Sequence, residues 1–187
     1  MSSRHPAEDP DHTDDRGVAV DPVTALGTAL SRLDGRVATL ADRAGQGPLL
    51  VAVVERESST CHAALRALAG SGARFCAVSQ GRPEAAAELR DACGLDERDL
   101  LVEPAPHPVS DALAAEQVPT FVLIDGLELA AWQDGWDQHA MRSMVARADG
   151  RLEQGADEVA DEPCPSRLAL DQEQQARAEE QDAARRR

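Results

Sequence analysis

The stretch Glu55–His62 reads ERESSTCH and lies between an apolar run, PLLVAVV (48–54), and an Ala/Leu-rich segment, CHAALRALAG (61–70). The apolar run predicts a buried strand, and the second segment predicts a helix capped by a serine or threonine of residues 58–60. Cys61 then lies in the first turn of this helix. A thiol there faces unpaired N–H groups and the positive end of the helix dipole, which favour the thiolate. The stretch therefore predicts a strand-to-helix turn suited to thiol chemistry.

The chain beyond this turn continues to alternate between strand and helix patterns. The next expected strands cover 74–80, 99–104, 119–125 and 127–133, and the expected helices cover 83–93, 109–116 and 137–148. Strands separated by helices favour parallel pairing, and the turn at Asp125-Gly126 predicts a hairpin that adds an antiparallel strand. We expect one α/β domain over 47–150, with a central mixed sheet flanked by helices.

The segments on either side of this domain differ from it in composition. Residues 1–20 are polar and acidic and predict a disordered tail. Residues 21–46 predict an amphipathic helix with Asp21 as cap and Pro22 at its first position. Its apolar residues are spaced alternately by three and four: Val23, Leu26, Leu30, Leu33, Val37, Leu40 and Ala44. This stripe packs on the domain itself or, alternatively, forms a homodimer through residues 22–44. Residues 151–187 predict a polar, charged tail, as a solvated helix or as disorder.

The overall composition excludes several classes of partner. A net charge of −15 argues against nucleic acid, because phosphate binding needs clustered basic residues. The polar N-terminus contains no apolar signal region, and no apolar run reaches the roughly 18 residues of a membrane span. We therefore expect a cytoplasmic protein with no membrane partner and with mostly reduced cysteines.

Two motifs resemble the thioredoxin superfamily, namely SSTC (58–61) at the place of its C-x-x-C pair and QVPTFVLID (117–125) at its cis-proline segment. The likeness is closest to the TlpA-like and peroxiredoxin-like (AhpC/TSA-type) branch and covers about residues 48–148. Within it, GWD (135–137) is similar to the start of the last helix of that branch. The resemblance implies a thioredoxin-like fold, with a cis Val118–Pro119 bond that brings Pro119 and Thr120 close to the thiol.

The candidate site departs from the two-cysteine pattern. Ser58 takes the position of the attacking cysteine, and a hydroxyl cannot attack a disulfide as a thiolate does. Cys61 matches the second cysteine. The peroxiredoxin pattern S-x-x-C instead implies that Ser58 orients a peroxide at a Cys61 thiolate, although this chain has Val54 where that family has proline. That family's arginine is also missing from VPTF, and Arg56 and Arg66 are candidate substitutes.

Two functions therefore stay open. The first is a one-cysteine thiol oxidoreductase or peroxide-reducing protein that uses Cys61, with protein thiols, protein disulfides or a small peroxide as partners. The alternative is a catalytically silent thioredoxin-fold module that binds proteins. The reactivity of the Cys61 thiol distinguishes them. No cofactor is expected, and no metal site either, because the cysteines form no C-x-x-C pair.

The remaining polar candidates fall outside this motif. Cys164, in the tail segment EPCPS, is a candidate resolving thiol for Cys61. Cys76 predicts a core residue, and Cys93 predicts a helix end before Gly94. Asp134 and Asp137 predict a turn and a helix cap rather than a catalytic pair. The isolated histidines predict surface positions: His62, His107 and His139.

Overall fold

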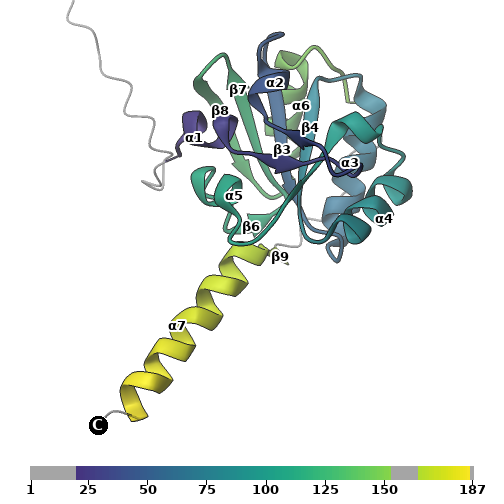
Figure 1. Cartoon of the computed structure of the whole chain (residues 1–187). Helices are drawn as coiled ribbons and strands as arrows, with labels where there is room; N and C mark the ends of the chain where they lie inside the picture. The colour runs from purple at the N-terminus through teal and green to yellow at the C-terminus, as the bar shows by residue number, and fades with distance from the viewer. Residues whose placement is uncertain (1–19, 153–163, 186–187) are drawn as a thin grey trace, which may run out of the picture.

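The structure, a computed structural model, describes residues 20–152 and 164–185 (Figure 1). The predicted disordered tail at 1–20 lies almost wholly outside the described residues. The helices are α1 (Pro22–Gly27), α2 (Ala41–Ala44), α3 (Ser59–Ser71), α4 (Pro83–Cys93), a 3-10 turn η1 (Glu97–Asp99), α5 (Pro108–Ala112), α6 (Gln138–Arg147) and α7 (Arg167–Arg185). The strands are β1 (Leu30–Ser31), β2 (Val37–Ala38), β3 (Leu49–Val54), β4 (Phe75–Gln80), β5 (Leu100–Glu103), β6 (Gln117–Val118), β7 (Thr120–Asp125), β8 (Glu128–Asp134) and β9 (Cys164–Pro165).

The main sheet is mixed and has the strand order β2-β1-β5-β4-β3-β7-β8. The strands β3, β4 and β5 run parallel, as the intervening helices require. The β7–β8 hairpin adds antiparallel strands beside β3, with Asp125 paired with Glu128 across its turn. Every residue of β3 and β4 is buried, which explains the wholly apolar sequence of β3 and the apolar first four residues of β4. The predicted mixed sheet flanked by helices is confirmed.

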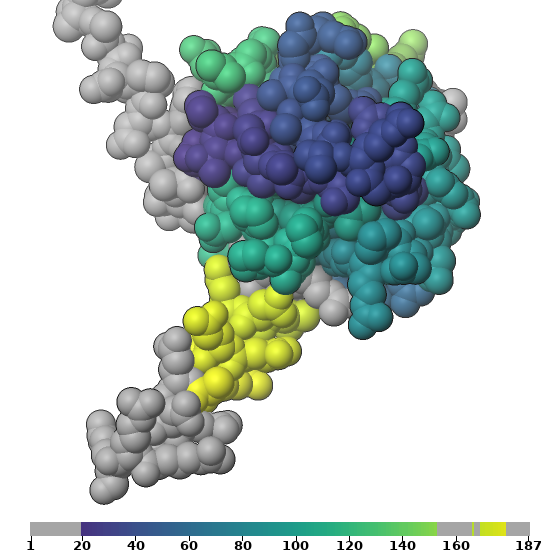
Figure 2. All heavy atoms as spheres, viewed as in Figure 1, coloured from purple at the N-terminus to yellow at the C-terminus, as the bar shows by residue number. Residues whose placement is uncertain are grey.

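The prediction of one amphipathic helix over 21–46 is wrong. The helix begins as expected, with the Asp21 side chain accepting the Thr24 N–H, but it ends at Gly27. The chain then forms the β1–β2 hairpin, in which Gly35 adopts a φ of +80°. Leu30 and Leu40 are buried in the domain's own core, and Figure 2 shows this purple segment spread across the domain surface.

The spacing misled the prediction because its apolar residues are spread over four short elements and the turns between them. Each of these elements buries one or two side chains, whereas Val23 and Val37 are 57% and 72% exposed. Tertiary pairing of β1 with β5 fixes Leu30 as a strand residue, which overrides the weak helical propensity around Gly27. The stripe expected to form a dimer seam is therefore divided between the core and two exposed valines.

The C-terminal residues form an extended segment and then a helix. β9 pairs with β6 in a separate two-stranded sheet, and α7 projects from the lower end of the domain in Figure 1. Residues 171–178 of α7 are exposed, so the described part of the predicted polar tail is a solvated helix. In the described part of the chain, no helix combines the length and the hydropathy that a membrane crossing requires.

Candidate functional site

The first turn of α3 holds Ser58 and Cys61. Ser58 is the N-cap, and its Oγ accepts the backbone N–H of Cys61 at 3.2 Å. Cys61 is 0% exposed, and Ser58 is 5% exposed. The predicted cap is thus present, and the Ser58 hydroxyl accepts a hydrogen bond from the helix backbone. The thiol belongs to the apolar core of the domain.

The predicted cis-proline is also present, since the Val118–Pro119 bond is cis. Thr120 pairs with Val53 on β3, which places Pro119 beside the end of β3 and the loop leading to Ser58. The Thr120 Oγ1 lies 2.7 Å from the Gln117 carbonyl oxygen and 3.1 Å from a carboxylate oxygen of Asp134. Thr120 is fully buried, so its hydroxyl stabilises this turn of the backbone.

The edge of β6, directly before cis Pro119, is paired with an extended segment. In the antiparallel β6–β9 register, Gln117 lies opposite Pro165 and Val118 lies opposite Cys164. The Ser166 N–H then donates to the Glu116 carbonyl oxygen at 3.0 Å. Cys164, the candidate resolving thiol, is therefore brought by its backbone to the cis-proline edge. Its pairing with Cys61 stays a prediction.

The two arginines proposed to support a Cys61 thiolate are engaged elsewhere. Arg56 forms ion pairs with Glu88 at 2.5 Å and with Glu57 at 3.1 Å. These carboxylates raise the pKa of Arg56, led by its hydrogen bond to Glu57. Arg66 donates from Nε to the Ala92 carbonyl oxygen at 3.3 Å. Both arginines are therefore paired with groups other than the Cys61 thiol.

The other cysteines behave as predicted from the sequence. Cys76 is fully buried on β4, and burial raises the pKa of its thiol to about 12. Cys93 is the last residue of α4, and burial raises its pKa as well. Both thiols are structural in character, because a raised pKa disfavours the reactive thiolate. The predicted role of Asp137 as the cap of α6 is confirmed, whereas Asp134 is the last residue of β8 rather than a turn residue.

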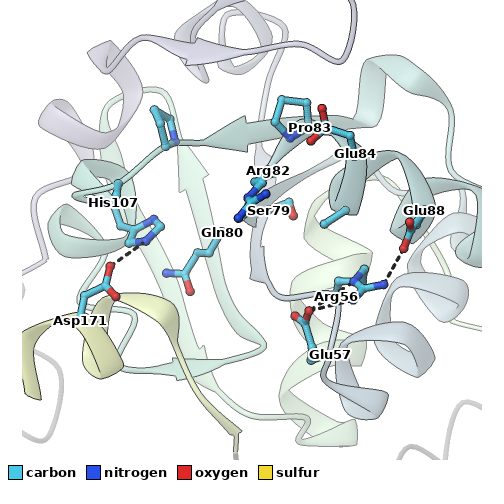
Figure 3. Close-up of a pocket in the computed structure, with 14 residues that line it drawn as sticks. Arg56, Glu57, Ser79, Gln80, Arg82, Pro83, Glu84, Glu88, His107 and Asp171 are labelled. Carbon is cyan, nitrogen blue, oxygen red and sulfur yellow. Dashed lines mark hydrogen bonds and ion pairs between the residues drawn. The ribbon is translucent and has the colours of Figure 1, made fainter. Parts of the chain in front are cut away.

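A cavity of about 830 Å³ opens at the carboxyl ends of β4 and β5. Figure 3 shows His107 and Gln80 at one side of it and Arg56 with its two glutamates at the other. His107 is 4% exposed, so its prediction as a surface residue is wrong. Its Nε2 lies 3.5 Å from an Asp171 carboxylate oxygen on α7. Its Nδ1 is buried without a hydrogen-bond partner in the described residues.

A buried carboxylate supports the loop that carries His107. Glu103 ends β5 and is 0% exposed. Its side chain accepts the N–H groups of Val109 and Ser110 and the Ser110 hydroxyl, at 2.9 Å for the Ser110 N–H. Burial raises the pKa of Glu103, although these hydrogen bonds oppose the shift. Gln80 Nε2 donates to the Ser110 Oγ at 2.7 Å and extends the network.

Sequence reasoning missed this network. Its one local signal was the cluster of prolines around His107, at positions 104, 106 and 108. Such a cluster predicts a constrained loop at a strand end, and the Ala105–Pro106 bond is cis. In the ranges 20–152 and 164–185, His, Cys, Asp and Glu form no cluster suited to a metal ion.

Comparisons with known proteins support the fold. Neither family models nor curated proteins give a match. Among solved structures, the chain is similar to a secreted Mycobacterium tuberculosis disulfide oxidoreductase homologous to E. coli DsbE. That match has a TM-score of 0.53 and 14% identity and covers 65% of this chain and 96% of the other.

Two further structures agree with it. The thioredoxin domain of a thiol-disulfide oxidoreductase from Bacteroides vulgatus matches with a TM-score of 0.56 and 16% identity, over 68% of this chain and 96% of that domain. A thioredoxin-like protein from Porphyromonas gingivalis matches with a TM-score of 0.53 and 16% identity, over 71% and 95%. The chain has the thioredoxin-like fold, as the sequence predicted.

Proposed function

We propose that this chain is a protein-binding module of thioredoxin-like fold, which holds an extended partner segment along β6 and performs no thiol exchange at Cys61. The observation that carries the proposal is the pairing of β6 with β9 directly beside cis Pro119. Backbone pairing at a strand edge is a general way to bind extended peptides, and contacts of the peptide's side chains add specificity.

The geometry of the α3 turn argues against the thiol function. Disulfide exchange requires a thiolate to reach the sulfur that it attacks, and peroxide reduction requires contact between the thiolate and a peroxide oxygen. The sulfur of Cys61 has no exposed surface, and Ser58 supplies a hydroxyl that already caps α3. A role for Cys61 in either reaction would require the first turn of α3 to open.

The first experiment measures the reactivity of the Cys61 thiol. We expect iodoacetamide to leave Cys61 unmodified in the folded chain between pH 6 and 9 and to modify it fully after unfolding, as read by peptide mass mapping. We also expect no insulin reduction and no sulfenic acid with hydrogen peroxide. Insulin reduction, or sulfenic acid formation, by the wild-type chain would overturn the proposal in favour of the thiol function if Cys61→Ala abolished it.

The second experiment measures binding at the β6 edge. A fluorescent peptide of residues 160–176, with serine in place of Cys164, serves as the probe. It is added to the full chain carrying Ser166→Ala and Asp171→Ala, which weaken the hold of the chain's own segment. We expect saturable binding by anisotropy. A control peptide with alanine in place of Ser166 and Asp171 should bind about tenfold more weakly, since it lacks the helix-capping hydroxyl and the carboxylate that contacts His107. Equal binding of both peptides, or none, contradicts the proposal.

A further inference from the structure

Among the described residues, the C-terminal segment contacts the domain along a short strand ladder and at His107. β6 and β9 each contribute two residues to their ladder, and Ser166 adds one backbone hydrogen bond to Glu116. A two-stranded ladder of this length has little stability by itself. Beyond it, α7 reaches the domain through Asp171 and His107, while its residues 171–178 are exposed. The segment is thus docked on β6 in a defined register, and a partner segment could replace it there.

Ser166 links the extended part to the helix. It is 0% exposed, its N–H pairs with the Glu116 carbonyl oxygen, and its Oγ accepts the Ala169 N–H at 3.1 Å. One residue therefore ends the strand and caps the helix. The cap sets the direction of α7 and brings Asp171, five residues later, to the Nε2 of His107.

We propose that residues 164–171 are a tethered ligand that occupies the partner site and must detach before a partner binds. This inference rests on the proposed function. It also defines the partner class: a protein segment with two extended residues opposite Val118 and Gln117, then a serine-capped helix with an acidic side chain opposite His107. The chain's own segment competes from a high effective concentration, because a short linker joins it to the domain.

A disulfide trap tests whether the segment occupies the edge. Val118 and Cys164 are directly paired, and paired positions on antiparallel strands are close enough for a disulfide. We expect Val118→Cys, treated with oxidised glutathione, to form a 118–164 disulfide within one chain while releasing two equivalents of reduced glutathione. Val118→Cys/Cys164→Ser is the matched control and should not form it. Gln117→Cys/Pro165→Cys in a Cys164→Ser background repeats the test if Val118→Cys does not fold.

The disulfide products formed show whether the inference holds. A folded protein whose cysteines at 118 and 164 both stay reduced would overturn the inference. A covalent dimer linked through 118–164 would also overturn it, because the occupant would then be the segment of a second copy. A disulfide between 118 and 61 would overturn it as well, because position 118 would then be closer to Cys61 than to Cys164, and peptide mapping identifies which cysteines are joined.

Competition tests whether the segment blocks the site. The 160–176 probe should bind the Ser166→Ala/Asp171→Ala chain at least about tenfold more tightly than the wild-type chain. The disulfide-locked protein should bind no probe until it is reduced. Equal affinity for the wild-type and weakened chains would refute the blocking role. A trap that forms while no chain binds the probe would leave the tethered contact intact but refute the proposed partner function, so the two failures are distinguishable.

Discussion

Two strand-to-helix turns at the same end of the sheet differ in how their sequences relate to their chemistry. The turn from β3 to α3 carries the motif S-x-x-C, yet its serine caps the helix and its thiol lies in the apolar core. The turn from β5 to α5 carries no recognisable motif, yet it holds a buried carboxylate and a buried histidine. A sequence motif is therefore not needed to identify a turn that buries polar groups, since the β5–α5 turn buries them without one.

The largest expected effect tests the β5–α5 turn. Glu103→Ala would leave the N–H groups of Val109 and Ser110 buried without their acceptor. We expect a loss of about 3 kcal/mol in the free energy of unfolding, measured by urea denaturation. Glu103→Gln keeps one carbonyl oxygen and should lose about 1 kcal/mol. Equal losses for both variants would show that the hydrogen bonds to this carboxylate contribute little.

Glu103 should also make the stability of the protein depend on pH. Because burial raises the pKa of Glu103 in the folded state, the folded protein holds this proton more strongly than the unfolded chain. The wild-type protein should therefore lose stability relative to Glu103→Gln as pH rises from the ordinary pKa of 4.5 through the raised value. The measurement is the difference in unfolding free energy across this window. A difference that grows with pH in favour of the wild type would contradict the assignment.

A smaller effect is expected at the thiol of the α3 turn. Cys61→Ser places a hydroxyl in the apolar core and should cost about 2 kcal/mol in unfolding free energy. Cys61→Ala removes only the sulfur and should cost about 1 kcal/mol. Thermal and urea unfolding of the pair measure the difference. A serine variant as stable as the wild type would place Cys61 in a polar environment and weaken the contrast between the two turns.

Loss of the α3 cap should have a still smaller effect. Ser58→Ala removes the acceptor of the Cys61 N–H and should cost about 1 kcal/mol. Ser58→Asn is the matched control, since it restores a capping oxygen. Urea denaturation of both variants provides the test. If alanine costs nothing, the hydroxyl of Ser58 is available for a role other than capping.

The smallest effect is expected at the link between α7 and the β5–α5 turn. Asp171 is half exposed, at 53%, and a polar contact with one exposed partner contributes little. Asp171→Asn should change the unfolding free energy by less than about 0.5 kcal/mol. A loss above 1 kcal/mol would make α7 part of the folding unit rather than a docked segment.

Much of the central domain could be predicted from the sequence because β3 is wholly apolar, the other strands contain apolar runs, and the helices have clear ends. Gly94 ends α4 in a left-handed conformation with a φ of +69°, and Asp137 caps α6, both at predicted positions. The cis state of Pro119 followed from resemblance rather than from the residues alone. At the N-terminus, the spacing of three and four fitted a helix, but the chain instead forms the β1–β2 hairpin and pairs β1 with β5.

The polar features of the site could not be predicted because they depend on contacts between distant residues. Glu103 is an ordinary acidic residue at a strand end until α5 folds over it and supplies its donors. The β6–β9 pairing joins Val118 with Cys164, and nothing near either residue specifies the other. Burial of His107 likewise depends on the loop around it and on α7.

The N-terminal hairpin also bears on self-association of the whole molecule. β1 covers the backbone groups of β5 that would otherwise form an open edge of the sheet, while β2, the outermost strand, is only two residues long. A long apolar edge favours aggregation, and a very short one offers little to pair with. A chain beginning at Gly47 would expose β5, whose residues are all buried here. We expect it to form larger particles by light scattering than the full chain, so these residues limit association rather than promote it.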